Sequence, residues 1–271
     1  MSSTFFFLLM LPLITVSQSW NPNSGSDKDV FILAGQSNMA GRGGVEDNRC
    51  WNGAVPPESR PSPFVLRLTA KLRWQVAHEP LHADIDVGKV CGVGPGMAFA
   101  NAIVKSGAVG NYCWSRRVIG LVPCAVGGTR LSEWGRGTRL YGEMVGRAGE
   151  AARDGKGRIR AVLWYQGESD TVRREDAEAY RGNLERFIRD LRCDLNDTSL
   201  PFLVVAVASG EGKFVDTVRR AQLEIGLKNV KTVDAKGLPL KSDHLHLTAS
   251  SEVHLGLKLA HAYLASFSHL L

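Results

Sequence analysis

The sequence predicts an α/β fold, namely a three-layer α/β/α sandwich in which helices cover both faces of a central, mostly parallel sheet. Two patterns support this prediction. Several short runs are rich in β-branched and apolar residues and lack the alternation of a half-exposed strand, which is typical of parallel strands buried on both faces. Amphipathic helical patterns separate these runs, and a regular alternation of strands and helices is typical of an α/β domain.

The elements follow one another along the chain. The predicted strands are residues 29–35, 117–126, 160–167, 201–209 and 230–235. The predicted helices are residues 96–106, 139–153, 176–192, 213–227 and 249–267. The clearest helix is 176–192, because its apolar residues recur at helical spacing, opposite its Arg and Glu residues. Residues 41–95 are irregular and contain many Gly and Pro residues, so we expect a long excursion with one short hairpin near 64–75.

Composition and charge restrict the classes of function. The chain has 271 residues, of which 44% are hydrophobic, and this composition fits one large globular domain. The formal net charge is +6, but the arginines are scattered among acidic and apolar residues, so we expect a solvated basic surface and no nucleic-acid partner. Attraction to an acidic polysaccharide is a weaker alternative. After the N-terminus, no apolar run reaches the roughly 18 residues that a membrane span requires.

The N-terminus carries the pattern of a secretory signal peptide. Residues 4–16 are apolar and are followed by small and polar residues, so we expect residues 1–19 to be a signal peptide and residues 20–271 to form a single extracellular domain. An additional hydrophobic helix or strand at the edge of the domain is the alternative. The sequon at Asn196 and five cysteines, which could form two disulfides and leave one free thiol, also favour secretion.

Stretches of polar residues occur where ligands of parallel α/β sheets gather, beyond the carboxyl ends of the strands. Ser37 follows the strand 29–35, but a serine in such a Gly-rich turn is usually a turn or capping residue. The G-x-S-x-G elbow is absent, because Met39 holds the fifth position. A second stretch contains Gly127 and Gly128, whose backbone N–H groups can approach a ligand, although a plain turn is the alternative.

The third stretch is "WYQGESD", residues 164–170, at the end of an apolar strand. It places Gln166, Glu168 and Asp170 at the same edge of the predicted sheet. Alternatively, Gln166 satisfies backbone groups and Glu168 caps the following helix.

The fourth stretch is "KSDHLHLT", residues 241–248. Asp243 and His246 are three residues apart, so one turn of the chain brings the carboxylate to the imidazole, where it can fix the tautomer and stabilise the protonated form of a general base. His244 and His246 could instead be surface residues or imitate a metal-binding pair. We predict no metal site, because no third set of ligands with recognisable spacing is present.

Together the four blocks resemble a known family. "GQSNMAGRG", "GGTRLSEW", "WYQGESD" and "DHLHLT" are similar to the blocks of SGNH hydrolases, specifically the SASA-domain carbohydrate esterases, which include sialate and acetylxylan O-acetylesterases and plant homologues. The resemblance covers roughly residues 28–265 and implies the flavodoxin-like sheet of that superfamily.

The resemblance also implies roles for individual residues. Ser37 would be the nucleophile, His246 the general base and acid, and Asp243 the group that orients His246. The oxyanion hole would comprise the backbone N–H groups of Ser37 and Gly128 and the side-chain amide of Gln166.

Three further residues match the motifs without a definite role. We expect Arg130, Trp134 and Glu168 to bind substrate or to support the oxyanion hole. The walls of the substrate pocket should come from residues 41–95 and 129–140. The expected wall residues include Arg42, Trp51, Arg130 and Trp134.

These roles predict a serine esterase that removes O-acetyl groups from a sugar or polysaccharide through an acyl-enzyme, with no metal or organic cofactor, in the cell wall or apoplast. A catalytically inactive carbohydrate-binding protein on the same fold is the first alternative. The second is a glycosidase with a carboxylate pair, whose separation the sequence does not supply. Its candidate carboxylates are Glu133, Glu168, Asp170 and Asp243. The identity of the acetylated substrate and the oligomeric state stay open.

Overall fold

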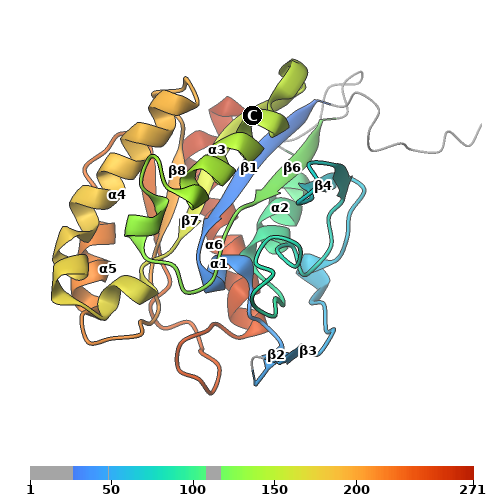
Figure 1. Ribbon diagram of the computed structural model, residues 1–271. Coiled ribbons are helices and arrows are strands. Elements are labelled where there is room, and N and C mark those ends of the chain that lie inside the picture. Colours follow the sequence, from blue (N-terminus) through green and yellow to red (C-terminus); the bar gives the residue numbers. More distant parts are fainter. Residues whose placement is uncertain (1–26, 48, 108–116) are drawn as a thin grey trace, which may run out of the picture.

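The computed structural model describes residues 27–47, 49–107 and 117–271, and a seven-stranded sheet forms its centre (Figure 1). The strands of this sheet are β1 (Lys28–Gly35), β4 (Val65–Leu68), β5 (Trp74–Val76), β6 (Val118–Pro123), β7 (Gly157–Tyr165), β8 (Phe202–Ala206) and β9 (Val230–Asp234). Their order across the sheet is β5-β4-β6-β1-β7-β8-β9. All neighbouring strands are parallel except β4 and β5. The predicted fold class and the five predicted strands are confirmed.

The hairpin predicted near 64–75 is present as β4 and β5, and it extends the central sheet. Leu66 pairs with Val76 on one side and with Gly120 of β6 on the other. The sequence does not reveal this extension, because pairing with β6 depends on residues distant in the chain. A separate two-stranded sheet, β2 (Val45–Glu46) with β3 (Cys50–Trp51), lies in the same irregular excursion.

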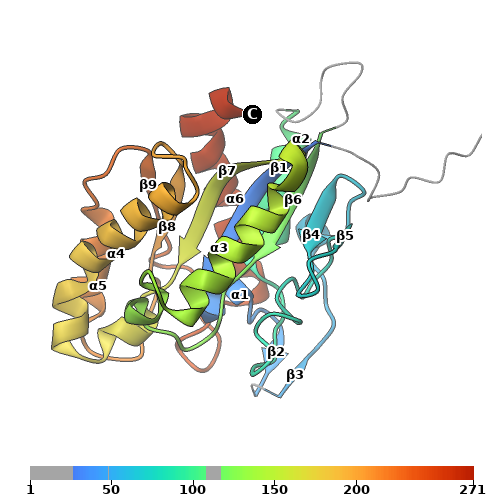
Figure 2. The same cartoon turned by 45° about the horizontal axis from the view of Figure 1, so that its top comes forward.

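Helices cover both faces of the sheet (Figures 1 and 2). The α-helices are α1 (Ser37–Ala40), α2 (Pro95–Lys105), α3 (Arg139–Ala151), α4 (Arg174–Asp194), α5 (Val215–Leu223) and α6 (Ala249–Phe267). Short 3₁₀ helices are η1 (Pro57–Ser59), η2 (Leu131–Trp134), η3 (Arg153–Gly155), η4 (Glu168–Thr171) and η5 (Ser268–Leu270). Helices α2 and α6 pack against each other on one face, and α3, α4 and α5 lie on the other. The five predicted helices are confirmed, although α5 ends before the predicted residue 227, where Gly226 disfavours helix.

Aromatic side chains fill the core on both faces of the sheet. Beneath α2 and α6, the ring of Phe31 lies edge to face at 4.9 Å from Phe99 and 5.0 Å from Tyr263, measured between centroids. On the other face, Trp134 and Trp164 meet edge to face at 5.3 Å. Such pairs stabilise a core beyond the area they bury. They fix β1 and β7, the central strands that end next to the candidate site.

Other expectations concern the cysteines and the N-terminus. Four cysteines lie in the described residues and are free thiols, namely Cys50, Cys91, Cys124 and Cys193. The expectation of two disulfides is therefore wrong for this part of the chain. Cys113 and the predicted signal peptide, residues 1–19, lie outside the described residues. Within the described ranges, no helix is long and apolar enough to cross a membrane.

Candidate active site

Ser37 lies directly beyond the carboxyl end of the central strand β1. The chain turns at Gly35, whose φ of 130° favours glycine and where a Cβ atom would overlap the Tyr165 carbonyl oxygen of β7. The Gln36 N–H then donates to this carbonyl at 2.8 Å. Ser37 is the first residue of α1, so its N–H has no partner within that helix. The sharp turn therefore leaves both the hydroxyl and the amide of Ser37 at the edge of the sheet.

Asp243 and His246 form a compact turn between β9 and α6. Asp243 Oδ1 accepts hydrogen bonds from the backbone N–H groups of Leu245 at 3.0 Å and His246 at 2.9 Å. Asp243 Oδ2 lies 2.8 Å from His246 Nδ1, and His246 Nε2 lies 3.0 Å from Ser37 Oγ. The structure thus brings together three side chains that the sequence selects, two of them more than 200 residues from the third.

The electrostatic environment favours an ionised Asp243 beside a neutral His246. Burial raises the pKa of Asp243, but hydrogen bonds from His246 and Leu245 outweigh it and hold the pKa at about 2. Burial lowers the pKa of His246 below its usual value, Asp243 opposes this shift, and the cations Arg42 and Lys241 lower the pKa further. An ionised carboxylate beside a neutral imidazole is the arrangement in which Nε2 can accept a proton from a hydroxyl.

The Gly127-Gly128 loop follows β6 and reaches the same place. The Gly127 N–H donates to Asp86 Oδ2 at 3.1 Å, and Asp86 also forms a buried ion pair with Arg42. Gly128 has a φ of 74°, in the left-handed region that favours glycine. In the described part of the chain, neither the Gly128 amide nor the Ser37 amide donates a hydrogen bond. Two donors without partners therefore flank the serine hydroxyl.

These groups surround a cavity of about 230 Å³. It is smaller than the roughly 300–1,000 Å³ typical of sites that enclose a drug-sized ligand. Its lining residues are Ser37, Arg42, Lys89, Val90, Gly127, Gly128, Glu211, Leu245 and His246. The cavity can accept a small group next to Ser37, and a larger ligand would extend beyond it into solvent.

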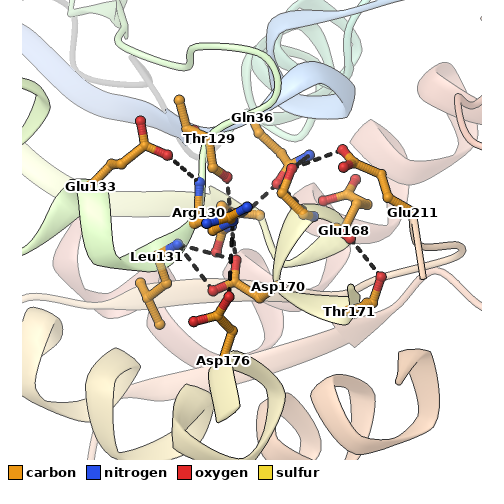
Figure 3. A network of polar contacts seen from close by, with 12 residues as sticks. Gln36, Thr129, Arg130, Leu131, Glu133, Glu168, Asp170, Thr171, Asp176 and Glu211 are labelled. Atoms are coloured by element: carbon orange, nitrogen blue, oxygen red, sulfur yellow. Dashed lines mark hydrogen bonds and ion pairs between the residues drawn. The ribbon is translucent and has the colours of Figure 1, made fainter. Parts of the chain in front are cut away.

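Gln166 lies at the end of β7 but does not line this cavity. It is fully buried, and its Nε2 donates to Asp170 Oδ2 at 2.6 Å and to the Thr129 carbonyl at 2.9 Å. Figure 3 shows Thr129 and Asp170, which carry these two acceptors, in one polar network. Asp170 in turn accepts from the Leu131 N–H at 3.1 Å. The structure therefore places Gln166 beneath the loop that carries Gly128, with both amide hydrogens engaged.

The other predicted support residues are also buried or distant. Trp134 is fully buried against Trp164, and its indole N–H donates to Thr129 Oγ1 at 3.1 Å, so it supports the glycine loop from below. Glu168 is fully buried and accepts from Asn38 Nδ2 at 2.7 Å, and burial raises its pKa to about 7.

The expectation about the pocket walls is correct for residues 41–95, which contribute Arg42, Lys89 and Val90, and wrong for residues 129–140, none of which lines the cavity. Of the four named wall residues, only Arg42 lines the cavity. Trp134 belongs to the core, because the short helix η2 turns it inward. Arg130 lies outside the cavity and points to Asp176, 3.9 Å away (Figure 3), while Trp51 lies in the β2–β3 sheet.

Sequence reasoning did not name several lining residues individually. Glu211 follows β8, so the same rule of polar residues beyond strand ends could have found it. Lys89 and Val90 lie in the irregular excursion and carry no local signal. Asp86, which holds both Arg42 and the glycine loop, likewise has no recognisable motif around it.

A metal site does not emerge from the geometry. Across residues 27–47, 49–107 and 117–271, no group of three or more His, Cys, Asp or Glu side chains could hold a metal ion. The groups at the candidate site are instead a hydroxyl, an imidazole, a carboxylate and backbone amides. These are the types of group that a Ser-His-Asp triad and its oxyanion hole use in acyl transfer.

Comparison with known proteins relates the chain to carbohydrate esterases. The model of a family described as "Carbohydrate esterase, sialic acid-specific acetylesterase" matches residues 27–265. An Arabidopsis thaliana protein named as a probable carbohydrate esterase is 58% identical over 243 residues, which cover 88% of this chain and 91% of that protein.

Solved structures show the same architecture. A crystal structure of an Arabidopsis thaliana protein, 56% identical, superposes with a TM-score of 0.84 and covers 89% of this chain and 99% of that chain. NanS (TM-score 0.66, 15% identity) covers 90% of this chain and 98% of its own. A carbohydrate acetylesterase from Xanthomonas citri (TM-score 0.60, 20% identity) covers 89% and 57%. At these low identities, the last two support the fold alone.

Proposed function

The chain belongs to the SASA family of carbohydrate esterases, and on this premise we propose that it is a serine esterase that hydrolyses O-acetyl esters of a sugar or polysaccharide. The observation that supports the serine mechanism is the continuous contact from Ser37 Oγ through His246 to the Asp243 carboxylate. A serine hydroxyl is a weak nucleophile and needs an adjacent base of this kind.

In the proposed mechanism, His246 Nε2 takes the hydroxyl proton while Ser37 Oγ attacks the carbonyl carbon of the acetyl ester. The tetrahedral intermediate breaks its bond to the sugar oxygen, which leaves with the proton held by His246, and an acetyl-serine remains. Water, deprotonated by the same imidazole, attacks this ester and releases acetate, and the proton returns to Ser37. Asp243 stays ionised throughout and stabilises the imidazolium.

We assign the oxyanion hole to the backbone N–H groups of Ser37 and Gly128, because neither of them donates a hydrogen bond to another group in the described residues. Removing one such donor typically costs about 3–4 kcal/mol of transition-state stabilisation. Gln166, the third donor expected from the resemblance, already uses both amide hydrogens. We propose that it acts by fixing Thr129, next to Gly128.

The substrate class rests on the cavity and on the family. A cavity of about 230 Å³ beside Ser37 suits an acetyl group, while the sugar would contact the rim, where Lys89 and Glu211 offer a donor and an acceptor. The glycosidase alternative has little support, since Glu168 and Asp170 are buried beneath the cavity and do not line it. All residues of the proposed catalytic site are present, and this disfavours a protein that only binds carbohydrate.

We also propose that residues 20–271 form a single esterase domain that is secreted after removal of residues 1–19. This proposal rests on the apolar run 4–16. The intact mass of the protein recovered from the medium of expressing cells tests it, because a retained N-terminus would contradict it.

The decisive test of the esterase is Ser37→Ala. We expect loss of acetate release from acetylated sugars and of p-nitrophenyl acetate hydrolysis, because no other hydroxyl reaches His246 Nε2 in the described structure. Ser132→Ala, which changes an exposed serine on η2, is the matched control and should retain activity. Retained activity in a folded Ser37→Ala protein would contradict the proposal. A screen of defined acetylated polysaccharides, with this variant as background, identifies the substrate.

A further inference from the structure

We propose that Asn38 and Glu168 are positioning residues that hold His246 in register with Ser37. The proposal rests on the esterase function proposed above and adds to it a role for Asn38, the neighbour of the serine. The two buried side chains join the segment after β1, the segment after β7 and the segment before α6.

The Asp243–His246 turn does not fix its own distance from the serine. Its hydrogen bonds to Asp243 come from residues 245 and 246 of the same turn. These bonds orient the imidazole relative to its carboxylate, and they would persist if the whole turn moved as a unit. The 3.0 Å separation of His246 Nε2 and Ser37 Oγ must therefore be set by bonds from the turn to the rest of the protein.

Asn38 supplies the bond that links the turn directly to the helix of the serine. The Leu247 N–H donates to Asn38 Oδ1 at 3.0 Å, and Asn38 Nδ2 approaches the Leu245 carbonyl at 3.5 Å. The amide thus contacts the residues on both sides of His246. Because Asn38 follows Ser37 in α1 and is fully buried, the same rigid turn carries the hydroxyl and the group that holds its partner.

Glu168 determines which way the Asn38 amide faces. Glu168 Oε1 accepts from Asn38 Nδ2 at 2.7 Å, and both side chains are fully buried. A reversed amide would direct its oxygen at this carboxyl oxygen and its NH₂ group at the Leu247 N–H, so two buried hydrogen bonds would be lost. The orientation that receives Leu247 is therefore the stable one only while Glu168 offers an acceptor.

Other bonds hold the turn without linking it directly to the segment that carries the serine. The Ser209 hydroxyl donates to the Leu245 carbonyl at 2.6 Å, and the Lys241 N–H donates to the His246 carbonyl at 2.7 Å. These bonds attach the turn to the end of β8 and to its own stem. Loss of the Asn38 contact should therefore displace His246 relative to Ser37 without unfolding the turn.

The test exchanges the donor and the acceptor. Asn38→Asp places two carboxyl groups against each other, and we expect kcat for acetyl ester hydrolysis to fall about 10- to 100-fold with KM nearly unchanged, the usual effect of a small misplacement of reacting groups. Combined with Glu168→Gln, the same change restores one donor, one acceptor and the original charge. The double variant should recover at least tenfold of the loss.

The pH profile distinguishes positioning from general destabilisation. In Asn38→Asp alone, a single proton shared by the two carboxyl groups restores the hydrogen bond. Loss of this proton at alkaline pH should therefore lower the activity. The wild type and the double variant should lack this alkaline fall. Burial, which already raises the pKa of Glu168 to about 7, places the shared proton in an accessible pH range. Thr232→Val is the remote control and should keep kcat, because it removes only the hydrogen bond from the Thr232 hydroxyl of β9 to the Gln222 carbonyl of α5.

Two further measurements test the same link between Asn38 and the turn. If Asn38→Asp does not fold, Glu168→Ala, which leaves the Asn38 amide without its acceptor, should still lower kcat at least fivefold, and amide exchange at Leu247 should accelerate. Unchanged kcat in a folded Asn38→Asp protein, or a double variant no better than the single one, would overturn the proposal. Retained activity in Ser37→Ala would instead refute the esterase mechanism, so the two failures are separate results.

Discussion

Asp243→Asn is the most informative single change in the proposed mechanism, because the structure dictates what the new amide must do. Asp243 Oδ1 accepts from the N–H groups of Leu245 and His246, so the oxygen of the substituted amide should stay there. Its NH₂ group then faces His246 Nδ1, which Oδ2 now contacts at 2.8 Å. A donor at that place forces Nδ1 to accept and puts the imidazole proton on Nε2, where it blocks proton transfer from Ser37.

The size of the effect follows from two contributions. Turning the amide over to recover the productive tautomer breaks two backbone hydrogen bonds, at about 1 kcal/mol each. The loss of the carboxylate also removes about 2 kcal/mol of imidazolium stabilisation, a reduced value because the Asp243 side chain is 30% exposed and partly screened by water. The sum of about 4 kcal/mol corresponds to a roughly 1,000-fold lower kcat. KM should change little, since Asp243 does not line the cavity.

The pH dependence of the residual activity tests the same mechanism independently, through the direction in which its acidic limb moves. The neutral imidazole is the active form, so kcat rises with pH through the pKa of His246. Asp243 raises that pKa against burial, and its neutralisation should therefore move the acidic limb of the residual activity to lower pH. The assay is acetate release between about pH 4 and 8, with Asp216→Asn on α5 as the control for an exposed carboxylate. A loss below tenfold, or an acidic limb that moves upward, would refute the reasoning.

The remaining predictions concern stability. Glu79→Gln should flatten the pH dependence of the unfolding free energy between about pH 9 and 6.5. Burial raises the pKa of Glu79 to about 8, so the folded wild type binds a proton that the unfolded chain lacks. The wild type therefore gains stability as the pH falls through 8. Below about pH 6.5, buried His82 opposes this gain, because burial lowers its pKa to about 3. The measurement is urea unfolding, and parallel curves of unfolding free energy against pH for variant and wild type above pH 6.5 would contradict the prediction. Gly35→Ala should lower the unfolding free energy by at least about 3 kcal/mol, because its Cβ would overlap the Tyr165 carbonyl at a positive φ, whereas Gly142→Ala, on an open face of α3, should be neutral or stabilising. Equal stabilities for these two variants would contradict it.

The sequence predicts the central strands and the residues beyond them for a physical reason. A strand buried on both faces must be apolar throughout, as β1 is, so a polar side chain such as Ser37 at its end is conspicuous. The spacing of Asp243 and His246 is likewise local, and a turn of three residues suffices to bring them together. Such features require no knowledge of the rest of the fold.

The sequence predicts that the excursion 41–95 contributes to the wall of the cavity, but not which of its residues do so apart from Arg42. Lys89 and Val90 come from an irregular segment that contacts β1 through His82 and the glycine loop through Asp86, and no periodicity marks them. Trp134 shows the converse error, because an aromatic residue near a glycine loop suits a sugar site, yet the core on the α3 face has room for its ring against Trp164. Burial of one aromatic residue depends on the volume left by others, and that volume is a property of the whole fold.

Buried carboxyl groups, rather than apolar packing, relate the segments of the candidate site to one another. Asp86 accepts from the Gly127 N–H, Asp170 from the Leu131 N–H, and Glu168 from the side chain beside the serine. A hydrogen bond fixes both a distance and an angle, whereas an apolar core repacks around many substitutions. Loss of the Asp170 or Glu168 acceptor should therefore shift a single segment by a fraction of an ångström while the aromatic cores on both faces of the sheet persist. Loss of Asp86 would also leave the buried Arg42 without its ion-pair partner and would destabilise the fold. The rate of the proposed reaction depends steeply on such shifts and global stability depends on them weakly, so the geometry of the site and the stability of the fold are separable in this chain.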